Sequence, residues 1–203
     1  MSLFNKLKND AAGAVNKVGG AAAGQVLNAA AGAVRSGGNR SWTVVFQEFP
    51  MTADALRSLP EATLREPHFA AALLIPALCL WPLNQPEALA MINFLKGPEG
   101  LSTREVQFIS ERLRGKEYVP SSYFNGATPN NNYDPTEPYT VVVTDNPYSY
   151  QEQGYAKLYL QSSGADSPRP VQLRQRPSSG EWFLWDQMLL SDIRQPVSAD
   201  PWA

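Results

Sequence analysis

The side chains that most often perform nucleophilic or metal chemistry are scarce in this chain. It contains one histidine, His68, and one cysteine, Cys79. A Ser-His-Asp triad would have to use His68, which follows Pro67 at the start of a predicted helix with no nucleophile motif nearby. We therefore expect a helix-capping or solvent-exposed histidine. Cys79 lies in an apolar run, where a cysteine behaves as a small buried hydrophobe.

A dyad of His68 and Cys79 is not expected either, because one helix would separate them by about 16 Å along its axis. One histidine and one cysteine supply no plausible zinc or iron site. The sequence also lacks both common glycine-rich phosphate loops, GxGxxG and GxxxxGK followed by Ser or Thr. Residues 130–134 offer oxygen ligands without the spacing of a known calcium loop, and a plain turn is the better interpretation. We expect no catalytic residue, no metal and no cofactor.

Six carboxylates in the second half of the chain leave one hydrolytic mechanism open. Two of them could form the pair of a glycoside hydrolase, which needs two carboxyl groups at a defined separation. Sequence does not give that separation, and solvated carboxylates at turns and strand edges are the simpler interpretation. The six are Asp134, Glu137, Asp145, Asp166, Glu181 and Asp186.

Aromatic residues concentrate in the same region, and all eight tyrosines lie within 118–185. Tyrosine offers rigid, amphipathic contact area that suits protein, peptide or sugar surfaces. Two loops, 123–133 and 146–150, are the richest candidates for recognition, although these rings could instead cover the protein's own helices. Arg169 is expected to pair with Asp166 across a polar loop. The candidate binding residues are Tyr123, Asn125, Tyr133, Tyr148, Tyr150 and Arg169.

Residues 1–38 differ in composition, and we interpret them as an amphipathic, Ala/Gly-rich helical arm. The first 40 residues hold five basic residues and one acidic residue, a net charge of +4 in a chain whose formal net charge is −2. Such an arm either meets an anionic surface or folds back on its own body. It could also stay disordered until it packs on something. Its attachment residues, at helical spacing, are Leu3, Phe4, Leu7, Val15, Val18, Val26 and Leu27.

The remaining residues, 39–203, are predicted to form a single α+β domain that follows a linker at Ser36–Asn39. A strand over 42–49 precedes a helical part over 50–116. The helix start signals are Thr52, Pro67, Asn84 and a capping box formed by Ser102 and Glu105.

From 117 to 195 the pattern becomes β-rich and aromatic. Alternating apolar and polar residues predict an antiparallel meander, closed by a short helix near Leu189 and followed by an extended tail over 196–203. The predicted fold class is α+β: an N-terminal amphipathic Ala/Gly helical arm, a helical group, then an antiparallel β-meander.

Four runs between Tyr118 and Ala203 stand out: Tyr-Val-Pro-Ser-Ser-Tyr-Phe-Asn-Gly-Ala-Thr-Pro, Gly-Ala-Asp-Ser-Pro-Arg, Trp-Phe-Leu-Trp and the final Ala-Asp-Pro-Trp-Ala. With them the chain resembles an uncharacterised bacterial family, a domain of unknown function. The resemblance covers about the last three quarters of the chain when the helices are included, but not the arm. It implies no activity, cofactor or catalytic residue, and it implies a bacterial or phage-associated origin.

These patterns favour a non-catalytic interaction or assembly module, attached through its arm to a neighbouring subunit, a partner or a membrane surface. The alternatives are a glycan- or cell-wall-acting hydrolase with paired carboxylates and an exported effector. A protein partner or a homo-oligomer is expected, and nucleic acid is not, because the pI is ≈ 5.5 and no dense basic stripe occurs. No secretory signal is recognised, and the apolar run 69–81 is shorter than the ~18 residues that cross a bilayer. We expect a cytoplasmic protein that could associate with a membrane or a particle.

Overall fold

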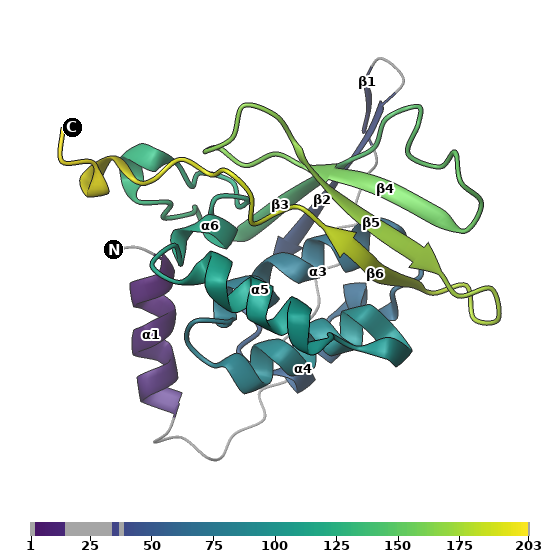
Figure 1. The fold of residues 1–203 in the computed structure, drawn as a ribbon, viewed down its shortest axis with the longest axis horizontal. Helices are drawn as coiled ribbons and strands as arrows, with labels where there is room; N and C mark the ends of the chain where they lie inside the picture. The colour runs from purple at the N-terminus through teal and green to yellow at the C-terminus, as the bar shows by residue number, and fades with distance from the viewer. Residues whose placement is uncertain (1–2, 15–33, 37–38, 203) are drawn as a thin grey trace.

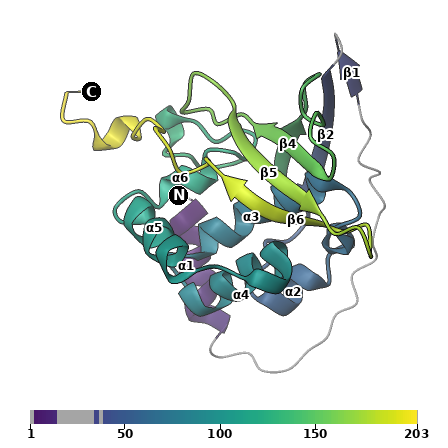
Figure 2. The same cartoon turned by 45° about the vertical axis from the view of Figure 1, so that its right-hand side comes forward.

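The computed structural model describes residues 3–14, 34–36 and 39–202. Six antiparallel strands form one sheet, and the longer helices lie together on one of its faces (Figures 1 and 2). This arrangement confirms the predicted α+β class. The second half of the predicted arm, with Val15, Val18, Val26 and Leu27, lies outside the described residues, as does the side chain of Phe4.

The helix α3, Pro67–Leu80, lies at the centre of the molecule. Thirteen of its 14 residues are buried, so it has no solvent-facing side. It packs against strands β2 to β6 on one side and against α4 and α6 on others. Its four alanines let the neighbouring elements approach closely. Pro67 occupies the first turn of α3, where its missing N–H leaves no hydrogen bond unmade.

The strands lie in the sheet in the order in which they occur in the sequence. Each of β3, β4 and β5 alternates buried and more exposed residues, because successive side chains of a strand point to opposite faces. The predicted meander is thus confirmed. The strands are β1 Val34–Ser36, β2 Asn39–Phe46, β3 Tyr139–Thr144, β4 Tyr155–Leu160, β5 Arg169–Gln175 and β6 Trp182–Gln187.

The predicted linker at Ser36–Asn39 joins two paired strands. Val34 pairs with Ser41, and Ser36 pairs with Asn39, so β1 and β2 form a hairpin. A pair of glycines between two strands is a hairpin signal as well as a linker signal. The sheet therefore begins before residue 39, inside the segment assigned to the arm.

The sheet opens between β3 and β4. These strands pair only at Val143–Leu160 and Thr144–Tyr159. Farther along β3, Phe124 makes an isolated bridge with Val141, and the Asn125 N–H donates to the Thr140 carbonyl at 2.9 Å. Backbone from a distant loop thus satisfies the part of β3 that β4 leaves unpaired.

Three further helices begin where capping residues predicted them. The side chain of Thr52 accepts from the Ala55 N–H at the start of α2, Ala53–Arg57, and Asn84 caps α4, Gln85–Lys96. Ser102 and Glu105 form a reciprocal capping box at the start of α5, Thr103–Leu113. In the part of the chain that the structure describes, no helix is long and apolar enough to cross a membrane.

Three further stretches differ from the sequence prediction, and one is the tail, where a 3-10 turn over Val197–Ala199 interrupts the expected extended chain. Residues 118–138, expected at the start of the β-rich part, form the short helix α6, Tyr118–Ser121, a 3-10 turn over Pro129–Asn131 and loops. Asn132 and Tyr133 have positive φ, which no strand accommodates. The short closing helix near Leu189 is replaced by turns, with Asp192 at φ 49. Leu189 and Leu190 are nevertheless buried in the core.

His68 is buried, which corrects the expectation of a capping or exposed residue. Its ring stacks on Trp42 with centroids 4.9 Å apart, and both ring nitrogens are buried without a hydrogen-bond partner. Burial, and then the nearby positive charge of Arg40, lower the pKa of His68 to about 4. The imidazole is therefore neutral at pH 7 and acts as an apolar ring in the core.

His68 makes the stability of the domain fall in acid. Between pH 6.5 and 4 the unfolded chain binds a proton at His68 and the folded chain does not, so lowering the pH favours unfolding. We expect His68→Phe to keep the stack on Trp42 and to remove this dependence. The free energy of unfolding of the wild type should drop by about 2–3 kcal/mol more than that of the variant between pH 7 and 4.5. Urea unfolding at both pH values measures the difference, and parallel losses in the two proteins would contradict it.

The N-terminal helix α1, Leu3–Ala14, folds back onto the body of the domain. Leu3 and Leu7 are almost completely buried in the hydrophobic core, and Lys6 pairs with Glu137. The sequence left open whether the basic arm meets an anionic surface or folds back on its own body. The described residues of α1 fold back on the body. Its buried leucines stabilise the fold.

Truncation of this face should destabilise the domain. We expect Leu7→Ala to lower the free energy of unfolding by roughly 2–5 kcal/mol, because it opens a cavity in the core. Lys8→Ala, at an exposed position of the same helix, is the matched control and should change it by less than about 0.5 kcal/mol. Chemical denaturation measures both. Equal stability of Leu7→Ala and wild type would show that α1 does not pack as described.

Candidate functional site

The tyrosines proposed for recognition divide into buried and exposed residues. Tyr123 and Tyr133 are buried, and their hydroxyls donate to the carbonyls of Leu189 at 2.6 Å and Arg194 at 2.7 Å. Burial raises the pKa of both phenols, that of Tyr133 to about 12. These two rings fasten the C-terminal segment to the domain. Asn125 has an exposed side chain, and its backbone pairs with β3.

The packing around Tyr133 leaves no room for a partner. Its ring stacks on Tyr118 with centroids 5.3 Å apart. A Cβ atom on Gly164 would lie 2.2 Å from the Tyr133 hydroxyl, so only glycine fits against it. The two tyrosines of the loop over 123–133 therefore serve the fold.

Arg169 also has a structural role, and it does not pair with Asp166. Its guanidinium donates to the carbonyls of Ser191 at 3.0 Å and Asp192 at 3.1 Å, and so braces the turns that follow β6. Asp166 pairs with Arg194 instead. A side chain between two turns finds backbone acceptors that sequence spacing does not show.

The loop over 146–150 places its tyrosines at the surface. Tyr148 is 69% exposed, and Tyr150 lies over the guanidinium of Arg40. Arg40 also stacks on Trp42 and binds the buried carboxylate of Asp145 at 2.6 Å. The polar groups of this cluster thus bind one another, and Tyr148 stands outside it.

Four of the six carboxylates are engaged in separate ion pairs. Glu137, Asp145, Asp166 and Glu181 pair with four different cations, respectively Lys6, Arg40, Arg194 and Arg176. Within the described ranges, no group of three or more His, Cys, Asp or Glu side chains could hold a metal ion. Cys79 is buried 3.9 Å from the Ser121 hydroxyl, and burial raises its pKa to about 12, so the thiol is not activated.

A different group of side chains forms the best candidate site. Between β5 and β6 the register shifts, because Gln172 lies opposite Asp186 while Leu173 lies opposite Leu184. Trp185 is the extra residue of this β-bulge, and its side chain is 41% exposed. Bulges on edge strands often redirect a side chain for a functional purpose.

Arg174 lies against two aromatic rings at this bulge. Its guanidinium carbon lies 4.8 Å from the ring centroid of Trp185 and 5.7 Å from that of Tyr155. The two rings meet edge to face at 5.9 Å. Stacking of this kind fixes the plane of a guanidinium and leaves its N–H edge available for a carboxylate or a phosphate.

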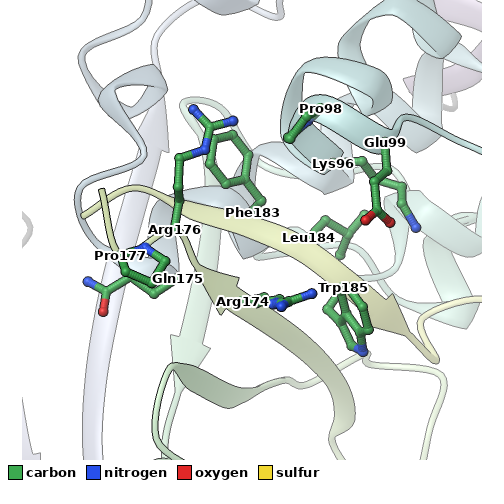
Figure 3. A pocket seen from close by; sticks show the side chains of 10 residues that line it. All are labelled: Lys96, Pro98, Glu99, Arg174, Gln175, Arg176, Pro177, Phe183, Leu184 and Trp185. Atoms are coloured by element: carbon green, nitrogen blue, oxygen red, sulfur yellow. The ribbon is translucent and has the colours of Figure 1, made fainter. Parts of the chain in front are cut away.

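Beside Arg174 lies a hollow of about 190 Å³ between the β5–β6 hairpin and the end of α4. Figure 3 shows Arg176 lying along Phe183 on one side, Arg174 along Trp185 on another, and Lys96, Pro98 and Glu99 opposite them. A smaller hollow of about 80 Å³ adjoins it and shares Lys96, Leu184 and Trp185. We call the six residues Lys96, Pro98, Arg174, Arg176, Phe183 and Trp185 the Trp185 surface.

Arg174 is the cation of this surface that is left to bind a ligand. Lys96 pairs with Glu105 at 2.5 Å, and Arg176 lies 3.6 Å from Glu181. Among the described residues, the Arg174 guanidinium has no hydrogen bond or ion pair. The Trp185 surface therefore combines an apolar hollow with one anion-binding side chain.

The outer edge of β6 is poorly suited to pairing with another strand. The Trp182 N–H already donates to the Leu64 carbonyl at 2.8 Å, and the bulge interrupts the regular ladder of β6. Such features protect an edge strand from adding another strand.

A family model described as a domain of unknown function, DUF6935, matches residues 48–197. The chain belongs to this family. No curated protein and no solved structure matches the chain.

The DUF6935 match includes the whole Trp185 surface and leaves out α1, β1 and β2. Sequence reasoning missed this site, because the alternation Trp-Phe-Leu-Trp did not say which face of β6 is buried. One signal was present: Arg174 and Arg176 lie two residues apart just before those aromatics, a spacing that puts them on the same face of an extended chain.

Removing the hydroxyl of a buried tyrosine should change the stability of the DUF6935 domain, whereas removing that of an exposed tyrosine should not. Tyr123→Phe leaves the buried Leu189 carbonyl without its donor, so the free energy of unfolding should fall by about 1–3 kcal/mol. Tyr148→Phe, at the exposed position, should leave it unchanged. Urea denaturation of the two variants makes the comparison, and an unaffected Tyr123→Phe protein would argue that this hydroxyl does not fasten the C-terminal segment.

Proposed function

We propose that this protein is a non-catalytic interaction or assembly module that binds a protein partner through the Trp185 surface. The observation that carries the proposal is Arg174, which lies against the rings of Trp185 and Tyr155 beside an apolar hollow and has no anionic partner among the described residues. Tryptophan and arginine are the side chains that most often dominate the energy of protein interfaces. An acidic side chain next to an apolar one is the partner chemistry that this surface fits.

The burial of Leu3 and Leu7 moves the proposed contact away from the arm. A membrane or partner could use these leucines only if α1 left the core, at the cost of exposing them. The Trp185 surface needs no such rearrangement. The hydrolase alternative gains no support, since four of the six carboxylates are engaged by separate cations.

The proposal includes a setting. A module of this kind, of bacterial or phage-associated origin, would work in the cytoplasm as part of a larger particle or at its surface. The family match is consistent with such a role without specifying it.

Site-specific photo-crosslinking tests the proposal. Glu99 is exposed on the rim of the hollow, so p-benzoylphenylalanine at position 99 would lie against a bound partner. Irradiation of cells that make this protein should give a covalent adduct heavier than the chain. Arg174→Glu should reduce the adduct at least tenfold, because it reverses the charge at the centre of the contact.

The same crosslinker at position 148 is the matched control, because Tyr148 is exposed but belongs to a different surface. Far-UV circular dichroism of Arg174→Glu checks that the fold is kept. The proposal fails if the crosslinker at position 99 gives no adduct. It also fails if the position-99 adduct persists in Arg174→Glu while the crosslinker at position 148 gives an adduct as well.

A further inference from the structure

The C-terminal segment 196–202 carries another exposed tryptophan besides Trp185, namely Trp202. Its side chain is 93% exposed, the highest value among the large apolar residues that the structure describes. The Trp202 N–H donates to the carboxylate of Asp200 at 2.9 Å, which places an acidic group beside the indole. One carboxylate oxygen is used in this turn, and the other is available to a cation.

The segment is held at its base. The Tyr133 hydroxyl donates to the Arg194 carbonyl just before this segment, and Ser198 hydrogen-bonds to Asn132. The 3-10 turn Val197–Ala199 also contacts the turn over Pro129–Asn131. These contacts fix the direction in which the segment leaves the domain and keep Trp202 away from it.

Trp202 and the Trp185 surface lie at opposite ends of the molecule. In Figures 1 and 2 the C-terminal segment, in yellow, extends from one end, and the turn between β5 and β6 lies at the other. The hollow is lined by residues next to that turn, including Arg176, Pro177 and Phe183. Trp202 therefore cannot enter the hollow of its own chain while its base is held.

The two ends are complementary in chemistry. One end offers a large ring with a carboxylate two residues before it, and the other offers an apolar hollow with the unpaired guanidinium of Arg174. An arginine whose plane is fixed by stacking favours a carboxylate over a neutral acceptor.

We propose that Trp202 of one copy of this chain enters the Trp185 surface of a second copy, with Asp200 paired to Arg174. This inference rests on the proposed function and names the partner as the chain itself. The contact joins two different patches, so it is heterologous and can continue from copy to copy into a ring or a filament. A dimer formed in this way still has one free Trp202 end and one free hollow.

A heterologous contact has a signature that a symmetric dimer lacks. Trp202→Ala removes the inserted ring and keeps the hollow, whereas Arg174→Glu spoils the hollow and keeps the ring. Each variant alone should stay a monomer of 22.3 kDa. An equimolar mixture should form a one-to-one heterodimer of twice that mass, because each variant supplies the end that the other has lost.

Sedimentation equilibrium of the purified full chain tests the inference. The mass of the wild type should rise above 22.3 kDa over a concentration range of about 1 µM to 1 mM. Asp200→Asn should weaken the association at least tenfold, and Tyr148→Ala, a change at an unrelated exposed aromatic residue, should leave it unchanged. Both altered ends are exposed, and circular dichroism confirms that each variant is folded.

Three results would overturn the inference: a wild type that stays monomeric at about 1 mM, a Trp202→Ala protein that assembles like the wild type, or a mixture of the variants that remains monomeric. The photo-crosslinking experiment separates this failure from that of the proposed function. An adduct at position 99 with a different protein would refute self-assembly and keep the interaction role, and absence of any adduct would remove both.

Discussion

The burial of α3 is the constraint on which the rest of this structure depends. A helix with an apolar stripe can lie against one layer, but α3 is apolar around its whole circumference and must be enclosed. The sheet covers one side of it, α4 and α6 cover others, and the inner side chains of five strands meet it. Even the histidine at its start is kept neutral and stacked on Trp42, as the apolar surroundings require.

Enclosing α3 decides which aromatic residues remain for recognition. The rings of Tyr123 and Tyr133 lie inside the domain, where they hold the chain that follows β6. Trp185 is kept outside by the bulge in β6. The density of aromatic residues in the second half of the chain therefore reflects two separate demands, closure of the core and presentation of a contact surface.

Local patterns in the sequence predicted the elements well, since their causes are local. Thr52, Asn84 and Ser102 begin helices because their side chains accept hydrogen bonds from N–H groups three residues later. The alternation in β3, β4 and β5 predicted strands because one face of each is buried. The stretch 118–138 was misjudged, as its aromatic content favours strands while the backbone of Asn132 and Tyr133 adopts positive φ.

The candidate site depends on relations that sequence does not contain. Whether Trp185 is exposed follows from the register between β5 and β6, and one extra residue changes the face that a side chain occupies. The role of Arg169 follows from carbonyls more than 20 residues away. His68 was misjudged for the same reason, because Trp42 reaches it from a strand that is remote in sequence.

The opening between β3 and β4 has a consequence for how the domain holds together. It divides the sheet into two leaves, β1–β3 and β4–β6, joined directly by only two residue pairs. The second leaf is made of two successive hairpins, while in the first leaf β3 follows β2 only after the helices, yet both leaves rest on α3. Cooperativity between the leaves must pass chiefly through the side chains of that helix, so amide hydrogen exchange within one leaf is coupled to the other by packing more than by the backbone ladder.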